Sequence, residues 1–278
     1  PQETFSRERW LILPEEVRQV KQTVEEAGTE LGEFCRTGQG MMTGLNEAFT
    51  VTDSEIQEWE IEQEALRPLV KNGDLRRFLY LGNEKDLIYL ENHNISDYPN
   101  TEEYLEQYRS DLESRAKADS VRWYRYQNPI NKDLFEECNQ KIICPFIATD
   151  NRFYVDQQGL YNDGGDIELI VQEESSSISD HYLVAILNST LLEFYHLNHA
   201  KLKRDGFYEY FGNSLQELPI ITSPNSGDSK EDIHELLDEK SREMAELKTK
   251  KASLNLTLTD YLGDYTEGES ITELGLTQ

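Results

Sequence analysis

Apolar residues recur at intervals of three to four positions in several parts of the chain, which is the spacing of an amphipathic helix. The spacing predicts a helix that begins at residue 15 and ends in a turn at Gly28. Thr101 has the residue type of an N-cap, and so do Ser179 and Asp180. Four further helices are predicted over residues 53–64, 101–118, 179–198 and 231–250.

Short runs rich in β-branched and aromatic residues alternate with these helices and predict strands. The runs are AFTVT (48–52), FLYLG (78–82), DLIYL (86–90), KIICPFIA (141–148), NRFYVDQQGLY (151–161) and DIELIVQ (166–172). The order of elements predicts an α+β fold, with a mixed or mainly antiparallel sheet core, packed helices and a C-terminal helical extension.

The composition of the chain suggests three parts. Residues 221–232 read ITSPNSGDSKED, which is the composition of a linker. We therefore expect a helical lead-in over 1–33, a main domain over 34–222, and a linker with a helical extension over 223–278.

Composition and charge exclude some protein classes. No apolar run approaches the roughly 18–20 residues of a membrane span, and the first residues lack the layout of a signal peptide. Three cysteines are an odd number without metal-type spacing, so we expect a cytoplasmic protein. The chain begins without Met and is expected to be a piece of a longer protein.

The chain is strongly acidic, with 54 acidic and 27 basic residues and a formal net charge of −27. Residues 1–33 carry 8 acidic and 4 basic residues, and residues 223–278 carry 13 and 6, so the excess is not confined to a tail. In molar salt the Debye length falls to about 3 Å, so the acidic side chains hardly repel one another. We interpret the charge as adaptation to a halophilic cytoplasm, which makes its sign uninformative about function.

Catalytic signatures are missing from the sequence. It contains no GxGxxG after a strand, no Walker motif, no GxSxG and no HExxH. His196 and His199 are spaced to share a helix face, but without a third ligand nearby we expect them to be solvated and not to bind a metal. Cys144 lies in an apolar run and is expected to be inert. We predict no catalytic residue, no metal and no cofactor within this chain.

Basic and aromatic residues gather at three places. These are 71–80, 122–126 and 201–211. Arginine and lysine bind phosphates and base edges, and aromatic rings stack on bases, so the clusters favour contact with nucleic acid. The alternative is that the aromatic rings belong to the core and that cations such as Arg76 and Arg125 pair with Asp74 or Glu136. The candidate DNA-binding residues are Lys71, Arg76, Arg77, Arg122, Arg125, Lys201, Lys203, Arg204 and Tyr208.

An ordered series of motifs resembles the TaqI-like specificity domain of adenine-specific DNA methyltransferases. GQGMMTGLNEAFTV matches that family's G-x-x-T-G-x-N-x-A-F, and LRPLVKNGDLRRF matches P-x-x-x-G-x-x-[IL]-x-[RK]-[FY]. RWYRY, the 141–171 strand region and YLVAILNSTLLEFYH follow in the family's order. The resemblance spans roughly residues 30–222 and closes at Gly206, Tyr210, Leu215, Leu218, Pro219 and Ile220.

The resemblance implies a target-recognition domain for double-stranded DNA within a type IIG restriction–modification enzyme or a phage-exclusion methyltransferase. It also implies an S-adenosylmethionine-binding methyltransferase domain with an NPP[YF] motif, upstream of residue 1 or on another chain, because neither that motif nor a cofactor glycine loop occurs here. Two alternatives remain: an acidic protein-interaction module that mimics DNA, and an enzyme with an unrecognised site.

Overall fold

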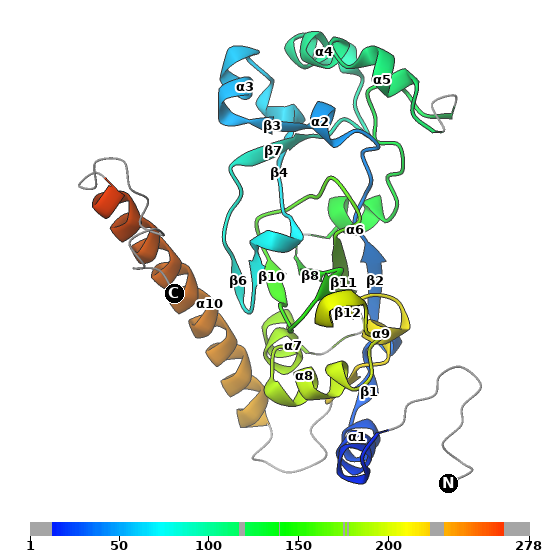
Figure 1. Cartoon of the computed structure of the whole chain (residues 1–278), viewed down its shortest axis with the longest axis vertical. Helices are drawn as coiled ribbons and strands as arrows, with labels where there is room; N and C mark the ends of the chain where they lie inside the picture. The colour runs from blue at the N-terminus through cyan, green and yellow to red at the C-terminus, as the bar shows by residue number, and fades with distance from the viewer. Residues whose placement is uncertain are drawn as a thin grey trace.

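A four-stranded antiparallel sheet forms the middle of the molecule (Figure 1). The structure is a computed structural model, and it describes residues 13–116, 120–138, 140–174, 176, 178–222 and 231–263. The strand order of the sheet is β10-β8-β11-β2. Its strands are β2 (Cys35–Gln39), β8 (Lys141–Pro145), β10 (Tyr154–Asp156) and β11 (Ile167–Gln172).

Successive residues on a strand point to opposite faces of the sheet. Both faces of this sheet are buried, and each faces its own core cluster. Ile143 and Leu169 face a first core cluster, which includes the aromatic rings of Phe135 and Tyr161. Ile142 and Ile170 face a second core cluster, formed with the helices that cover the other side. Those helices are α7 (Asp180–Leu187) and α8 (Thr190–Leu197).

The first core cluster continues into a second antiparallel sheet at one end of the molecule (Figure 1). That sheet has the order β3-β7-β4, with β3 (Thr50–Thr52), β7 (Lys85–Ile88) and β4 (Leu66–Pro68). The helices at this end are α2 (Asn46–Phe49), α3 (Asp53–Glu58), α4 (Pro99–Glu106) and α5 (Arg109–Glu113).

Three short strand pairs and the α-helices α1 (Glu15–Ala27), α6 (Lys132–Glu136) and α9 (Asn213–Gln216) lie around these two sheets. The pairs are β1 (Thr29–Glu30) with β13 (Pro219–Ile220), β5 (Leu75–Arg76) with β6 (Leu79–Tyr80), and β12 (Tyr208–Glu209) with β9 (Ile147–Ala148). All the strand pairs described here are antiparallel, so the predicted α+β fold with a mainly antiparallel sheet core is confirmed.

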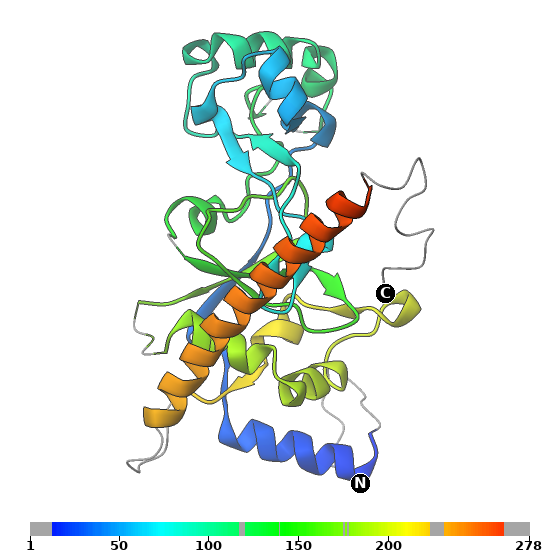
Figure 2. The same ribbon diagram turned by 90° about the vertical axis from the view of Figure 1, so that its left-hand side faces the viewer.

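The C-terminal extension is one long helix, α10 (Glu231–Gly263), which crosses one side of the molecule diagonally (Figure 2). It is attached to α7: the rings of Tyr182 and His234 stack at 3.8 Å, and the Ser179 hydroxyl donates to the Asp238 carboxylate. The helix continues beyond the predicted end at residue 250. The predicted linker falls largely on residues 223–230, which lie outside the described part of the chain.

Two predicted helices are each interrupted. The stretch 101–118 contains α4 and α5, and the first of these begins at Pro99, so Thr101 is not its cap. The Thr101 hydroxyl donates instead to the carboxylate of Glu62. The stretch 179–198 is divided at Asn188, whose side chain bonds to the N–H and C=O groups of Phe153 at 3.0 and 2.9 Å. The next residue, Ser189, caps α8 by accepting from the N–H of Leu192 at 3.2 Å.

Three smaller expectations also change. Ala48 and Phe49 belong to α2 and not to a strand, and the helix predicted over 53–64 ends at Glu58. His196 is completely buried beside Tyr210, with ring centroids 4.1 Å apart, and is not solvated. Within the described residues, no helix combines the length and apolarity that a membrane crossing requires.

Candidate nucleic-acid interface

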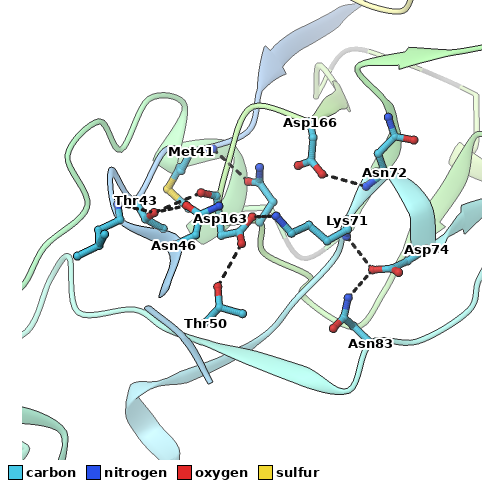
Figure 3. Close-up of polar contacts among 12 residues, drawn as sticks. Met41, Thr43, Asn46, Thr50, Lys71, Asn72, Asp74, Asn83, Asp163 and Asp166 are labelled. Carbon is cyan, nitrogen blue, oxygen red and sulfur yellow. Dashed lines mark hydrogen bonds and ion pairs between the residues drawn. The ribbon is translucent and has the colours of Figure 1, made fainter. Parts of the chain in front are cut away.

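Three loops meet between the two sheets (Figure 3). We call residues 40–46, 69–74 and 161–166 the loop junction. Their contact is direct: the Lys71 ammonium forms an ion pair with Asp163, and the Asn162 side chain accepts a hydrogen bond of 3.1 Å from the N–H of Met41. The first two motifs of the family resemblance therefore lie side by side and are joined by a segment about 90 residues later in the chain.

Further hydrogen bonds to Asp163 and Asp74 stabilise the loop junction. The second carboxylate oxygen of Asp163, a residue only 3% exposed, accepts from the Thr50 hydroxyl at 3.1 Å. The carboxylate of Asp74 accepts from the Lys71 N–H at 2.8 Å and from the Asn83 amide at 2.6 Å. Lys71 was predicted to contact DNA, but here its charge is neutralised within the protein.

Position 40 has no room for a side chain, which explains the glycine there. A Cβ atom at this position would lie 2.2–2.4 Å from the side-chain amide of Asn162, which is shorter than any normal contact. The glycine-rich stretch therefore serves the close approach of two loops.

A groove of about 640 Å³ opens beside the junction. Lys71 and Lys85 line it together with Glu47, Glu55 and Asp163, so acidic side chains outnumber basic ones. Such a lining does not favour a phosphate group. We therefore do not place the candidate interface in this groove.

The β5–β6 hairpin carries the next two predicted residues. Arg76 is exposed, and its guanidinium donates to the carbonyls of Gly73 and Leu75 at 2.9 and 2.8 Å, not to Asp74. Arg77 forms an ion pair with Glu193 on α8. The hairpin tip turns at Phe78, whose φ of 63° is unusual for a residue other than glycine.

The segment 122–126 lies at the end of the molecule that carries α4 and α5. Tyr124 and Tyr126 are buried in the first core cluster, so for these rings the alternative interpretation holds. Arg122 is exposed and donates to the Tyr124 hydroxyl at 2.7 Å. Arg125 is half-buried and reaches the His93 carbonyl at 3.4 Å, not Glu136.

Arg115 fixes the position of this segment, a role that no sequence pattern indicates. Its guanidinium donates to the carbonyls of Leu112 at 2.9 Å, Thr43 at 2.5 Å, Trp123 at 2.8 Å and Arg125 at 3.0 Å. Burial lowers the pKa of Arg115 below its ordinary value. It acts as a structural cross-link between the glycine-rich stretch and the Trp/Tyr segment.

The third cluster follows α8. Lys201 and Lys203 both pair with Glu209, whose side chain is 12% exposed. Arg204 is exposed. Tyr208 is half-buried in β12 and packs against the second core cluster, so its ring is only partly available for stacking.

The structure places two of the three clusters near opposite ends of α8 and leaves the other apart. Arg77 is tied to α8 through Glu193, and Lys201–Arg204 leave the end of the same helix, whereas Arg122 and Arg125 lie at the α4–α5 end (Figure 1). A cation that sequence reasoning missed also approaches the hairpin: the Lys248 ammonium lies 5.8 Å from the centre of the Phe78 ring. The run KTKK at 248–251 was its signal in the sequence.

Comparison with known protein families supports the resemblance for part of the chain. Residues 87–220 match the family model of the TaqI-like C-terminal specificity domain. This part of the chain is similar to a TaqI-like specificity domain. The matched region contains the end of β7, all of β8 to β13, the Trp/Tyr segment and the third cation cluster. The glycine-rich stretch and the β5–β6 hairpin precede the first matched residue.

Curated relatives are type II methyltransferases. The chain is 23% identical to M.BstVI of Geobacillus stearothermophilus over 84% of its own length and 41% of that protein. It is 24% identical to M.MjaIV of Methanocaldococcus jannaschii over 69% of its length and 66% of the relative. The chain therefore spans less than two thirds of the length of these relatives.

Solved structures share the fold. The type IIG restriction endonuclease BpuSI aligns with a TM-score of 0.57 at 14% identity, over 83% of this chain and 28% of that protein. The type IIL restriction–modification enzyme MmeI, solved in complex with DNA, aligns with a TM-score of 0.50 at 10% identity over 75% of this chain and 28% of the other.

Proposed function

We propose that this chain is the sequence-specific DNA-recognition part of an adenine-specific DNA methyltransferase of the restriction–modification type. The match of residues 87–220 to the TaqI-like specificity domain carries the proposal. The likeness to type II methyltransferases along most of the chain supports it.

Catalysis belongs, in this proposal, to a separate methyltransferase domain of the same protein or of a partner chain. That domain would bind S-adenosylmethionine and take the target adenine out of the duplex, because a base inside the helix cannot reach an active site. The specificity domain would hold the duplex in register for this step. Such a protein would work in the cytoplasm, where the genomic DNA is.

The proposal is tested with the complete protein that carries this chain. A pool of duplexes with random sequence is incubated with the protein and S-adenosylmethionine, and methylated positions are read by sequencing. We expect N6-methyladenine at one position of one short motif. Methylation of cytosine would overturn the adenine assignment, and methylation without a motif would overturn sequence-specific recognition.

The acidic composition favours one competing function, a protein-interaction module that mimics DNA. Binding to labelled duplex separates the two. A DNA mimic would ignore duplex and bind a basic protein, whereas a recognition domain would bind its target with an affinity that falls as salt rises.

A further inference from the structure

The second half of α10 is unusual in this acidic chain. Lys248, Lys250 and Lys251 lie within four residues, and no acidic residue occurs from Leu247 to Thr259. The first half of the helix, in contrast, carries most of its carboxylates, including Asp238 and Glu239. The charge of α10 is therefore divided along its length.

The fold places this basic half against the β5–β6 hairpin. α7 anchors the first half of α10, and the helix crosses this side of the molecule diagonally (Figure 2), so that its second half runs past β6. There the Lys248 ammonium lies 5.8 Å from the centre of the Phe78 ring. The hairpin contributes Arg76 and Arg77. Arg77 and Lys248, about 170 residues apart in sequence, are thus close enough for their charges to interact, and Arg76 precedes Arg77 on the same hairpin.

The positive charges at this surface repel one another. Burial lowers the pKa of Lys248, and the positive charges of Arg77 and Lys251 lower it further. The ion pair with Glu193 offsets the charge of Arg77, but Lys251 and Arg76 are exposed to solvent. A bound anion at this surface would relieve the repulsion, and a row of phosphates would do so repeatedly.

We propose that Lys248 and Lys251 of α10, with Arg76 and Arg77 of the hairpin, bind the phosphate backbone of duplex DNA. This inference rests on the proposed function and assigns part of the DNA-binding surface to the C-terminal extension. Contacts of this kind set the position of the duplex and carry no sequence information directly. In this proposal, α10 adds phosphate contacts to those of the region that resembles a specificity domain.

The test uses duplex binding by the complete protein, measured by fluorescence anisotropy over a series of KCl concentrations. The variant Lys251→Glu reverses an exposed charge, and Lys251→Gln removes the charge without adding a new one. Each phosphate contact contributes about one unit to the slope of log K against log[salt], so Lys251→Gln should reduce the slope by roughly one. Lys251→Glu should weaken binding about tenfold or more at 0.1 M KCl, equally for target and non-target sequences.

A matched control comes from the same helix. Lys240→Glu makes the same change of charge eleven residues away, about 16 Å along the helix axis and beyond the Debye length at 0.1 M salt. Lys240 pairs with Glu239 and Glu243 and is exposed. We expect Lys240→Glu to bind duplex like the parent.

Each result decides a different question. If the parent does not bind duplex, the proposed function fails and this inference fails with it. If the parent binds and both Lys251 variants keep its slope and affinity, only this inference is overturned. If Lys240→Glu weakens binding as much as Lys251→Glu, net charge and not this surface is responsible. Loss of association with the methyltransferase domain, with duplex binding intact, would assign the surface to a protein contact and would also overturn it.

Discussion

Lys141 and Asp156 form an ion pair of 2.7 Å in which both side chains are at most 1% exposed. They are direct partners across β8 and β10, and the Asp156 carboxylate also accepts from the N–H groups of Gln158 and Leu160, at 2.8 and 2.9 Å. The pair therefore joins two strands of the central sheet and holds the turn that follows β10.

Removal of one partner should be costly, because the remaining charge would be buried without compensation. Lys141→Met is expected to lower the free energy of unfolding by about 3–5 kcal/mol, measured by urea denaturation. Arg36→Ala is the control, since it breaks an exposed pair with Asp133 near the same sheet and should cost less than about 1 kcal/mol. Equal losses in the two variants would contradict a special role for the buried pair.

Glu168 gives the fold a defined pH dependence. The side chain is 4% exposed on β11, and burial raises its pKa from 4.5 to about 8. Between these values the folded state binds more protons than the unfolded state, so this residue makes stability fall as pH rises from about 4.5 to 8. Glu168→Gln should remove that slope and stabilise the protein at pH 8 by on the order of 2–4 kcal/mol. Parallel stability curves for parent and variant across pH 5–8 would refute this assignment.

Gly40→Ala tests the close approach at the loop junction. The added methyl group would overlap the Asn162 amide and disturb its bond to Met41, so we expect a loss of about 1–3 kcal/mol in thermal or chemical denaturation. Gly73→Ala is the matched control in the neighbouring loop, because nothing lies within 4 Å of the added atom. The junction would not depend on Gly40 if both variants unfolded like the parent.

Much of the secondary structure could be predicted because its causes are local. The end of α1 at Gly28 and the cap of α7 by Ser179, whose hydroxyl accepts from the N–H of Tyr182 at 3.0 Å, depend on neighbouring residues. The break at Asn188 has a local part, the cap of α8 by the Ser189 hydroxyl, which accepts from the N–H of Leu192 at 3.2 Å. Its other part, the bonding of Asn188 to Phe153, joins residues 35 positions apart and has no local signal in the sequence.

The candidate site was harder for the same reason. Lys71 and Arg77 look alike in sequence, yet Lys71 is committed to Asp163 and Arg77 to Glu193, more than 90 residues away in each case. In a chain with 54 carboxylates, sequence alone does not show which cations are neutralised. Exposure, which distinguishes Arg76 from these two, comes only from the fold.

Arg76 is therefore the hairpin residue from which we expect the clearest effect on recognition. As a phosphate contact, Arg76→Ala should weaken binding alike for target and non-target sequences and lower the salt slope by roughly one unit. A loss of about 1–3 kcal/mol confined to the target, with relaxed specificity at one position, would indicate a base-edge contact instead. Arg18→Ala on α1 serves as the control, and unchanged binding by Arg76→Glu would remove this residue from the interface.

Salt should stabilise the fold if the acidic composition is an adaptation to a halophilic cytoplasm. In molar KCl the Debye length is about 3 Å, which reduces repulsion among the carboxylates. The melting temperature should therefore rise between dilute buffer and 2 M KCl. The comparison salt is tetramethylammonium chloride at equal ionic strength, which separates screening from specific potassium binding. A flat or falling melting temperature in both salts would exclude the adaptation.

The pairing of β1 with β13 has a consequence for how such a protein can change over time. Thr29 lies opposite Ile220 and Glu30 opposite Pro219, so the chain arrives at and departs from the intervening 188 residues at adjacent points. A segment bounded in this way can be exchanged for another of different length without altering the separation of its flanks. The short β1–β13 pair thus fixes where the enclosed segment begins and ends, but a replacement segment would have to keep the surfaces of α7 and α8 on which α10 and α1 are held.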